Sequence, residues 1–124
     1  MDEVLEALVE AGFDYRSRYH YKIAESGSVE KELIQIVAAL NTQKILMRKF
    51  MSNWCIKADA TFRTNNLKLL LISVVGITST ERSFPGCLNF SRFDNKDTYD
   101  FLFDFINIRI FGDVVPPPRV IVAD

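Results

Sequence analysis

The chain has 124 residues, which is enough for one domain with a real hydrophobic core and too few for two. It is 48% hydrophobic and 25% charged with a net charge of −1, a globular composition that excludes chain-wide electrostatic attraction to nucleic acid. The longest apolar run, residues 69–77, is too short to span a membrane, and the N-terminus lacks a signal-peptide pattern, so we expect an intracellular location.

Residues 1–53 are predicted to form a helix, a β-hairpin and a second helix ahead of the core. Residues 2–11 carry apolar side chains at helical spacing, and a glycine follows them. Residues 15–23 alternate between apolar or aromatic side chains and basic ones, a period typical of a half-buried strand. The turn chemistry at 25–28 and the β-branched residues after it favour a returning strand over 29–40, although helix propensity leaves a helix open there.

The second helix is predicted over residues 43–50, with Asn41 or Thr42 as its cap. An apolar stripe defines the side of this helix that we expect to pack on the core. Its members are Ile45, Leu46 and Phe50.

Residues 54–124 are predicted to form a β-β-β-α-β core of an α/β (α+β) fold. Short turns separate three strands, which indicates an antiparallel meander, at 55–62, 69–78 and 83–93. A helix of about four turns follows, capped by Asp94 or Asn95, with its apolar residues at spacings of three and four. Since a helix precedes the last strand, that strand returns by a crossover, and we expect it beside the first strand and parallel to it.

Two aspartates occupy strand-like apolar runs. Asp59 interrupts the first strand of the core, and Asp124 ends the last one. A carboxylate in a buried strand is costly unless it is paired, hydrogen-bonded or bound to a metal. On adjacent strands, the two carboxylates would have the geometry of a two-carboxylate Mg²⁺ site. The plainer interpretations are a solvated strand-edge Asp59 and a fraying terminal Asp124.

Four segments of the core resemble a Mutator-like-element (MULE) transposase. They read DATFRTN at 59–65, LLLISVVGITSTERSFP at 69–85, TYDFL at 98–102 and PRVIVAD at 118–124. Mild departures from the family pattern are Phe62 and Arg63, where Tyr and Lys are usual, and Ala123, where Thr is usual. The resemblance covers residues 55–124 well and the N-terminal segment only loosely.

The resemblance implies an RNase H-like mixed sheet with DDE/DDD chemistry, in which three acids hold two Mg²⁺ (or Mn²⁺) ions that activate water and then a 3′-hydroxyl for attack on DNA. By that analogy Asp59 is the first metal ligand, bridging both ions, and Asp124 is the second. The third acid lies beyond the second in the family, so we expect a partial domain that is inactive alone. The implied partner is DNA at transposon ends, in the nucleus, with no membrane or small-molecule substrate.

Other candidate residues have competing interpretations. Thr64 and Asn65, with Arg63, could contact the nucleic-acid backbone, or could reflect strand and turn propensity. Arg16 and Arg18 could contact phosphates, although the solvated face of an amphipathic strand gives the same pattern and is favoured. His20 is expected at the surface. The cysteines, Cys55 and Cys87, lack CxxC spacing, which argues against a disulfide or zinc site.

Two alternatives to a catalytic role stay open. One is a non-enzymatic, transposase-derived module that binds DNA or protein, with vestigial acids. The other is a small α/β domain of unrelated function. A partial sheet would also leave the last strand as an exposed apolar edge, which predicts self-association or aggregation.

Overall fold

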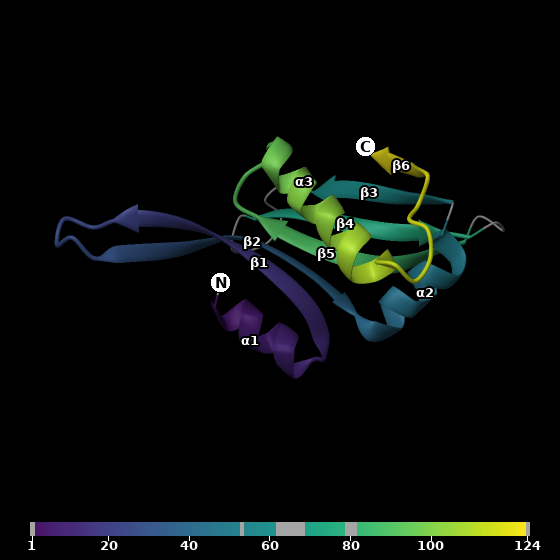
Figure 1. The fold of residues 1–124 in the computed structure, drawn as a ribbon, viewed down its shortest axis with the longest axis horizontal. Coiled ribbons are helices and arrows are strands. Elements are labelled where there is room, and N and C mark those ends of the chain that lie inside the picture. Colours follow the sequence, from purple (N-terminus) through teal and green to yellow (C-terminus); the bar gives the residue numbers. More distant parts are fainter. Residues whose placement is uncertain (1, 53, 62–68, 79–81, 124) are drawn as a thin grey trace.

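The computed structural model describes residues 2–52, 54–61, 69–78 and 82–123, and its centre is one six-stranded mixed sheet (Figure 1). The strand order is β1-β2-β5-β4-β3-β6. The strands are β1 (Phe13–Ile23), β2 (Val29–Leu40), β3 (Cys55–Thr61), β4 (Leu70–Ile77), β5 (Ser83–Ser91) and β6 (Val120–Ala123). The strands β3, β4 and β5 form the predicted antiparallel meander, and β6 pairs with β3 in parallel, as predicted.

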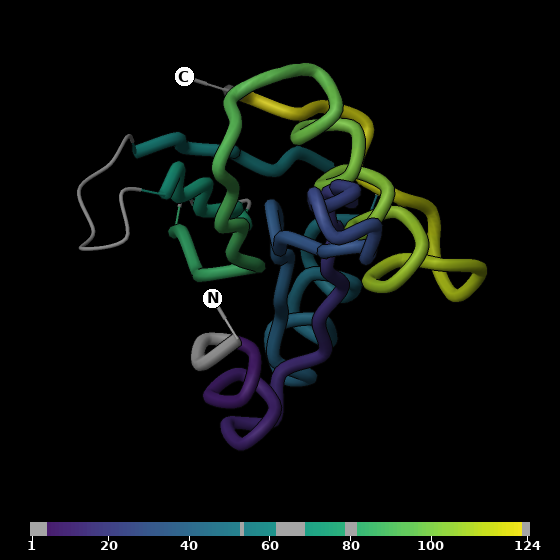
Figure 2. The backbone as a smooth tube through the Cα atoms, turned by 90° about the vertical axis from the view of Figure 1, so that its left-hand side faces the viewer, coloured from purple at the N-terminus to yellow at the C-terminus, as the bar shows by residue number. Residues whose placement is uncertain are grey.

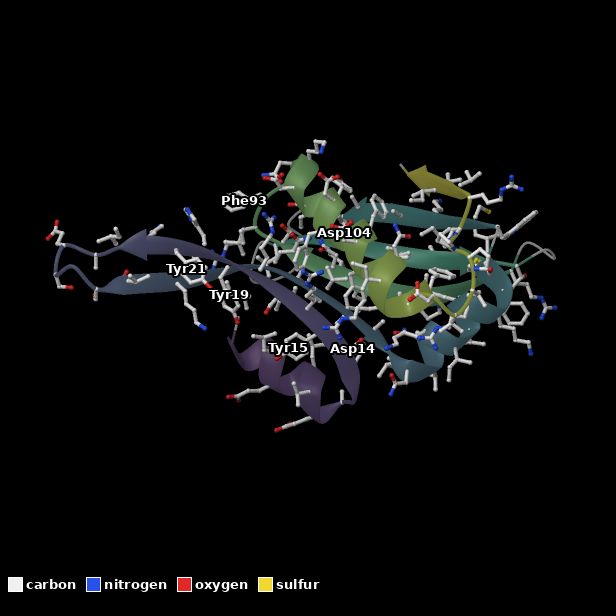
Figure 3. All side chains as sticks on the ribbon, viewed as in Figure 1. Asp14, Tyr15, Tyr19, Tyr21, Phe93 and Asp104 are labelled. Carbon is white, nitrogen blue, oxygen red and sulfur yellow. The ribbon has the colours of Figure 1, made fainter. Side chains whose placement is uncertain are left out.

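The hairpin of β1 and β2 joins the core sheet at its base and projects beyond it. The two strands pair from Phe13↔Leu40 to Ile23↔Val29, whereas β2 pairs with β5 only over residues 35–38. The predicted strand over 29–40 is thus confirmed, and its far half forms an arm that extends from the body (Figure 1). Three tyrosines follow one another along β1: Tyr15, Tyr19 and Tyr21 (Figure 3).

Helix α2 (Asn41–Met51) presents a different side to the core than the sequence predicted. Met47 and Met51 are fully buried, whereas Ile45, Leu46 and Phe50 are 58%, 39% and 42% exposed. The predicted stripe is therefore wrong, because two methionines fill the space against the sheet instead. The predicted caps are wrong too: Leu40 is the N-cap residue, and its N–H donates to Gln43 Oε1 over 2.9 Å.

The long helix after β5 changes its hydrogen bonding halfway along. Helix α3 (Lys96–Phe105) begins at Asn95, whose side chain accepts from the Thr98 N–H over 3.1 Å, so one of the two predicted caps is confirmed. A π-helical segment, η1 (Ile106–Phe111), continues it, which the sequence did not predict. Gly112 then ends it with φ +52, in the left-handed region that favours glycine.

The two faces of the sheet carry separate apolar clusters. Against one face, α2, α3 and η1 enclose the main core, which includes Met51, Ile56, Ile72 and Phe105. Against the other face, α1 (Asp2–Glu10) covers only the β1–β2 end, through Leu8, Leu33 and Ile36. Figure 2, which views the molecule along the hairpin, shows α1 and α3 separated by the strands. Beyond the reach of α1, the second face carries no helix among the described residues.

The edge strand β6 exposes apolar side chains, as the sequence predicted. Val120, Ile121 and Val122 are 55%, 44% and 44% exposed. Neither cysteine forms a disulfide, and Cys87 is buried in the core. Within the described part of the chain, no helix is long and apolar enough to cross a membrane.

Candidate functional site

Asp59 lies within β3, opposite Ser73 of β4 in the antiparallel ladder. Its side chain is exposed, so the desolvation cost expected of a buried carboxylate does not arise, and that part of the sequence argument was wrong. The alternation of β3 explains the exposure: Ile56 and Ala58 point into the main core, and Asp59 points to the opposite face with Cys55 and Lys57. Asp59 is therefore a solvated acid on the open face of the sheet.

The parallel ladder between β3 and β6 brings two distant parts of the chain together. Its four pairs run from Cys55↔Val120 to Ala58↔Ala123. In the sequence, an aspartate follows each member of the last pair: Asp59 follows Ala58, and Asp124 follows Ala123. Asp124 itself lies outside the described residues, as do the candidate nucleic-acid contacts Arg63, Thr64 and Asn65.

Asp59 suits one ligand position of a hard divalent cation. Mg²⁺ binds through one or two carboxylates and keeps several waters, which requires an accessible oxygen donor. The exposed Asp59 carboxylate meets that requirement. The described residues contain no group of three or more His, Cys, Asp or Glu side chains that could hold a metal, so they supply this one carboxylate and no complete ligand set.

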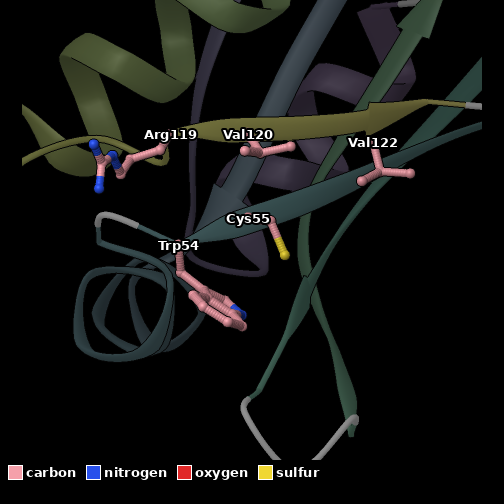
Figure 4. A pocket seen from close by; sticks show the side chains of 5 residues that line it. All are labelled: Trp54, Cys55, Arg119, Val120 and Val122. Atoms are coloured by element: carbon pink, nitrogen blue, oxygen red, sulfur yellow. The ribbon is translucent and has the colours of Figure 1, made fainter.

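A shallow groove of about 480 Å³ lies on the same face, at the opposite end of β3 (Figure 4). Its lining residues come from β3, β6 and the segments just before them: Trp54, Cys55, Arg119, Val120 and Val122. Cys55 precedes Asp59 by four residues on one face of the strand, which separates them by about 13 Å. The groove is largely apolar, with the guanidinium of Arg119 at one end (Figure 4).

Arg16 and Arg18 are not simply the solvated face of a strand. Their guanidinium carbons lie 5.1 Å and 5.8 Å from the ring centroid of Phe101 on α3. Arg18 Nε also donates to Gln35 Oε1 over 3.0 Å. This contact could not be predicted from the sequence, because it depends on where α3 brings Phe101 relative to β1. His20, by contrast, is exposed as predicted.

Gln35 connects these arginines to a buried polar network. Its amide nitrogen donates to Asn89 Oδ1 over 2.7 Å and to the Thr98 carbonyl over 2.8 Å. Gln35, Asn89 and Thr98 are all fully buried. Two buried donors, Arg18 Nη2 and Asn89 Nδ2, have no acceptor among the described residues. The strands β1, β2 and β5 and the helix α3 are therefore joined through one chain of amide and guanidinium contacts.

Comparison with known proteins gives one match. The family model described as the MULE transposase domain matches residues 55–124, the segment that forms β3 to β6 with α3 and η1. No curated protein and no solved structure matches the chain. The matched segment is more than half of the chain and coincides with the β-β-β-α-β unit on which Asp59 lies. The chain belongs to the MULE transposase domain family.

Proposed function

We propose that this chain contributes the metal-binding strands of a MULE-type transposase catalytic domain with an RNase H-like fold. In this account Asp59 and Asp124 bind Mg²⁺ or Mn²⁺ for phosphodiester hydrolysis and strand transfer on DNA at transposon ends. The observation that carries the proposal is the parallel β3–β6 ladder, whose last pair, Ala58↔Ala123, is followed on each strand by an aspartate. Family membership supports a transposase-related role and an interaction with DNA.

The chain's own residues have limited tasks in this chemistry. The Asp59 carboxylate is exposed and forms no ion pair or hydrogen bond with the described residues. It can therefore bind the cation without first breaking such an interaction. The ladder fixes the spacing of the two strands up to the pair Ala58↔Ala123, where the backbones lie about 4.8 Å apart. When bound, the metal pair supplies the activated oxygen nucleophile and stabilises charge at the phosphorus.

Two of the family's three acids are matched in this sequence, so we propose that the chain binds metal weakly and does not turn over DNA by itself. Calorimetric titration with Mg²⁺ should show weak binding that is lost in both Asp59→Asn and Asp124→Asn. A nicking and strand-transfer assay with Mg²⁺ and Mn²⁺ should show no turnover. Robust turnover by the isolated chain would refute the proposed incomplete acid set. Metal binding by either variant that equals wild-type binding would refute the assigned ligands.

A second candidate, a transposase-derived interaction module, is supported by a separate observation. The edge strand β6 and the groove beside it expose Trp54, Val120 and Val122, an apolar surface of the kind that partners cover. In that case the acids are vestigial. Absence of any Mg²⁺ or Mn²⁺ response at Asp59 at millimolar concentrations, together with concentration-dependent association, would favour this module over the catalytic segment.

A further inference from the structure

We propose that Arg16 and Arg18, held over Phe101, form a phosphate-binding clamp on the rim between β1 and α3. The clamp lies on the helix-covered face of the sheet, at the edge strand farthest in strand order from β3 and β6. It is therefore separate from Asp59, and the ligand class is a phosphate oxyanion. That the phosphate belongs to a nucleic-acid backbone rests on the proposed transposase function.

The two positive charges of Arg16 and Arg18 share one aromatic ring. Both guanidinium groups lie over one aromatic ring, at 5.1 Å and 5.8 Å from its centroid, and they belong to residues two apart on the same strand. Neither has a carboxylate partner among the described residues, whereas the neighbouring Asp14 is paired with Lys44 and Arg109. Like charges that share a site repel each other, and an anion between them removes that cost. The contact with Phe101 partly offsets the repulsion and holds both groups in place.

The guanidinium of Arg18 has one donor paired and another without an acceptor among the described residues. Its Nε donates to Gln35, which fixes the plane of the guanidinium, and its buried Nη2 has no acceptor among the described residues. An unsatisfied buried donor on a charged group costs more free energy than one on a neutral group. A guanidinium presents its donors in a geometry that matches phosphate oxygens. Because Nη2 is shielded from solvent, we expect an oxyanion that binds the exposed Arg16 to reach Nη2 only after the side chains around Arg18 rearrange.

Gln35 holds the Arg18 guanidinium in one orientation. Its Oε1 accepts from Arg18 while its Nε2 donates to Asn89 and to the Thr98 carbonyl, so a flipped amide would set donor against donor. These hydrogen bonds connect Arg18 of the clamp to the buried interior of the fold. The cations of the β1–β2 arm have no such connection among the described residues. Lys22, on the same strand, forms an exposed ion pair with Glu32 at 3.5 Å and is already compensated.

The acidic residues nearby limit the strength of the site. Helix α3 carries the exposed carboxylates Asp97, Asp100 and Asp104, of which Asp100 is paired with Lys96. These charges lower the positive potential around Phe101, and the whole chain carries a charge of −1. We therefore expect a single weak contact that depends strongly on salt, not a high-affinity site.

The test is a metal-free NMR titration of the arginine Nε–Hε signals with inorganic phosphate and, separately, with a short DNA duplex at low salt. Both ligands should shift the Arg16 and Arg18 signals. Arg16→Ala should weaken binding by about tenfold, the loss of one charge-assisted hydrogen bond, and Arg16→Lys by less. The matched control, Lys22→Ala, removes one positive charge from the same strand and should leave affinity within about twofold, as expected for an exposed, paired cation.

The outcomes separate this proposal from the proposed function. Asp59→Asn should retain the phosphate response, so loss of metal binding at Asp59 leaves the clamp intact. A response to inorganic phosphate but not to the duplex supports the phosphate site and assigns it to a free anion. The proposed clamp would be refuted if neither ligand shifted the Arg16 and Arg18 signals. It would also be refuted if Arg16→Ala and Lys22→Ala weakened ligand binding equally.

Discussion

Ala58 of β3 and Ala123 of β6 face each other as the last described pair of the parallel ladder. They come from opposite ends of the family-matched segment, and α3, η1 and the proline-rich approach to β6 lie between them in the sequence. Ala58 is buried in the main core, which fixes the face of β3 on which the next residue, Asp59, is presented. The ladder therefore links the fold of the core directly to the candidate metal site.

The orientation of α2 can be tested with a matched pair of truncations. Met51→Ala should destabilise the protein by about 2–5 kcal/mol, because the side chain is fully buried and its removal leaves a cavity. Ile45→Ala, on the same helix, should cost under about 1 kcal/mol, since Ile45 is 58% exposed. Urea denaturation of both variants is the measurement. A larger loss for Ile45→Ala would restore the stripe predicted from the sequence.

Gly76 and Phe84 should show strong energetic coupling. A Cβ at Gly76 would approach Phe84 Cζ to 2.2 Å, so the aromatic ring occupies the space that a side chain would need. Gly76→Ala alone should therefore destabilise the protein by about 1–3 kcal/mol, the typical cost of overpacking. In the Phe84→Leu background most of that cost should disappear. A double-mutant cycle by urea denaturation measures the coupling, and additive effects would show that the ring does not block this position.

The buried polar network should contribute to stability through Gln35. Gln35→Ala leaves Asn89 Oδ1 and the Thr98 carbonyl without this donor, and we expect a loss of about 1–3 kcal/mol for each group left unsatisfied. His20→Ala, an exposed change on the neighbouring strand, should stay within about 0.5 kcal/mol. Thermal and urea unfolding of both variants compare the two costs. Equal stability of the two variants would contradict a structural role for the network.

The two cysteines should differ in reactivity and in their effect at high pH. Burial raises the pKa of the Cys87 thiol from 9.0 to about 12. The unfolded chain releases this proton near pH 9 while the folded chain retains it, so this residue's contribution to stability is intact below pH 9 and falls as pH rises toward 12.

Alkylation and a Cys87→Ala variant test this difference. Iodoacetamide should modify the half-buried Cys55 in the native protein, while Cys87 should react only after unfolding. The variant should lose less stability than the wild-type protein between pH 9 and 11, although the cavity lowers its stability at every pH. Equal alkylation rates for both thiols in the native state would show that Cys87 is accessible.

The strands and the parallel return of β6 could be predicted from the sequence because they depend on local chemistry and on simple topology. The alternation along β1, the turn after it and the three prolines before β6 each limit the backbone to few conformations. The crossover helix between β5 and β6 then requires the last strand to return in parallel. These features need no knowledge of how side chains fill the interior.

The orientation of α2, the π-helical segment and the clamp could not be predicted because they depend on packing between distant elements. Sequence hydrophobicity ranks Ile45 and Leu46 above Met47 and Met51, whereas the space above the sheet is filled by the two methionines. The role of Phe101 likewise depends on the position of α3 beside β1. The strand that carries Asp59 was predicted correctly, but the exposure of the Asp59 side chain was not. A single acid in a strand does not show which face of the sheet is open to solvent.

The most direct test of the central claim is paramagnetic broadening by Mn²⁺, observed at the amide signals of Ala58 and Ala123. If Asp59 and Asp124 share one cation, both signals should broaden together at the same substoichiometric Mn²⁺ concentration. Asp59→Asn and Asp124→Asn should each abolish the broadening at both alanines, while Asp113→Asn, an exposed control, should change neither. Unchanged broadening in either Asp59→Asn or Asp124→Asn would show that the two acids do not hold a common metal ion.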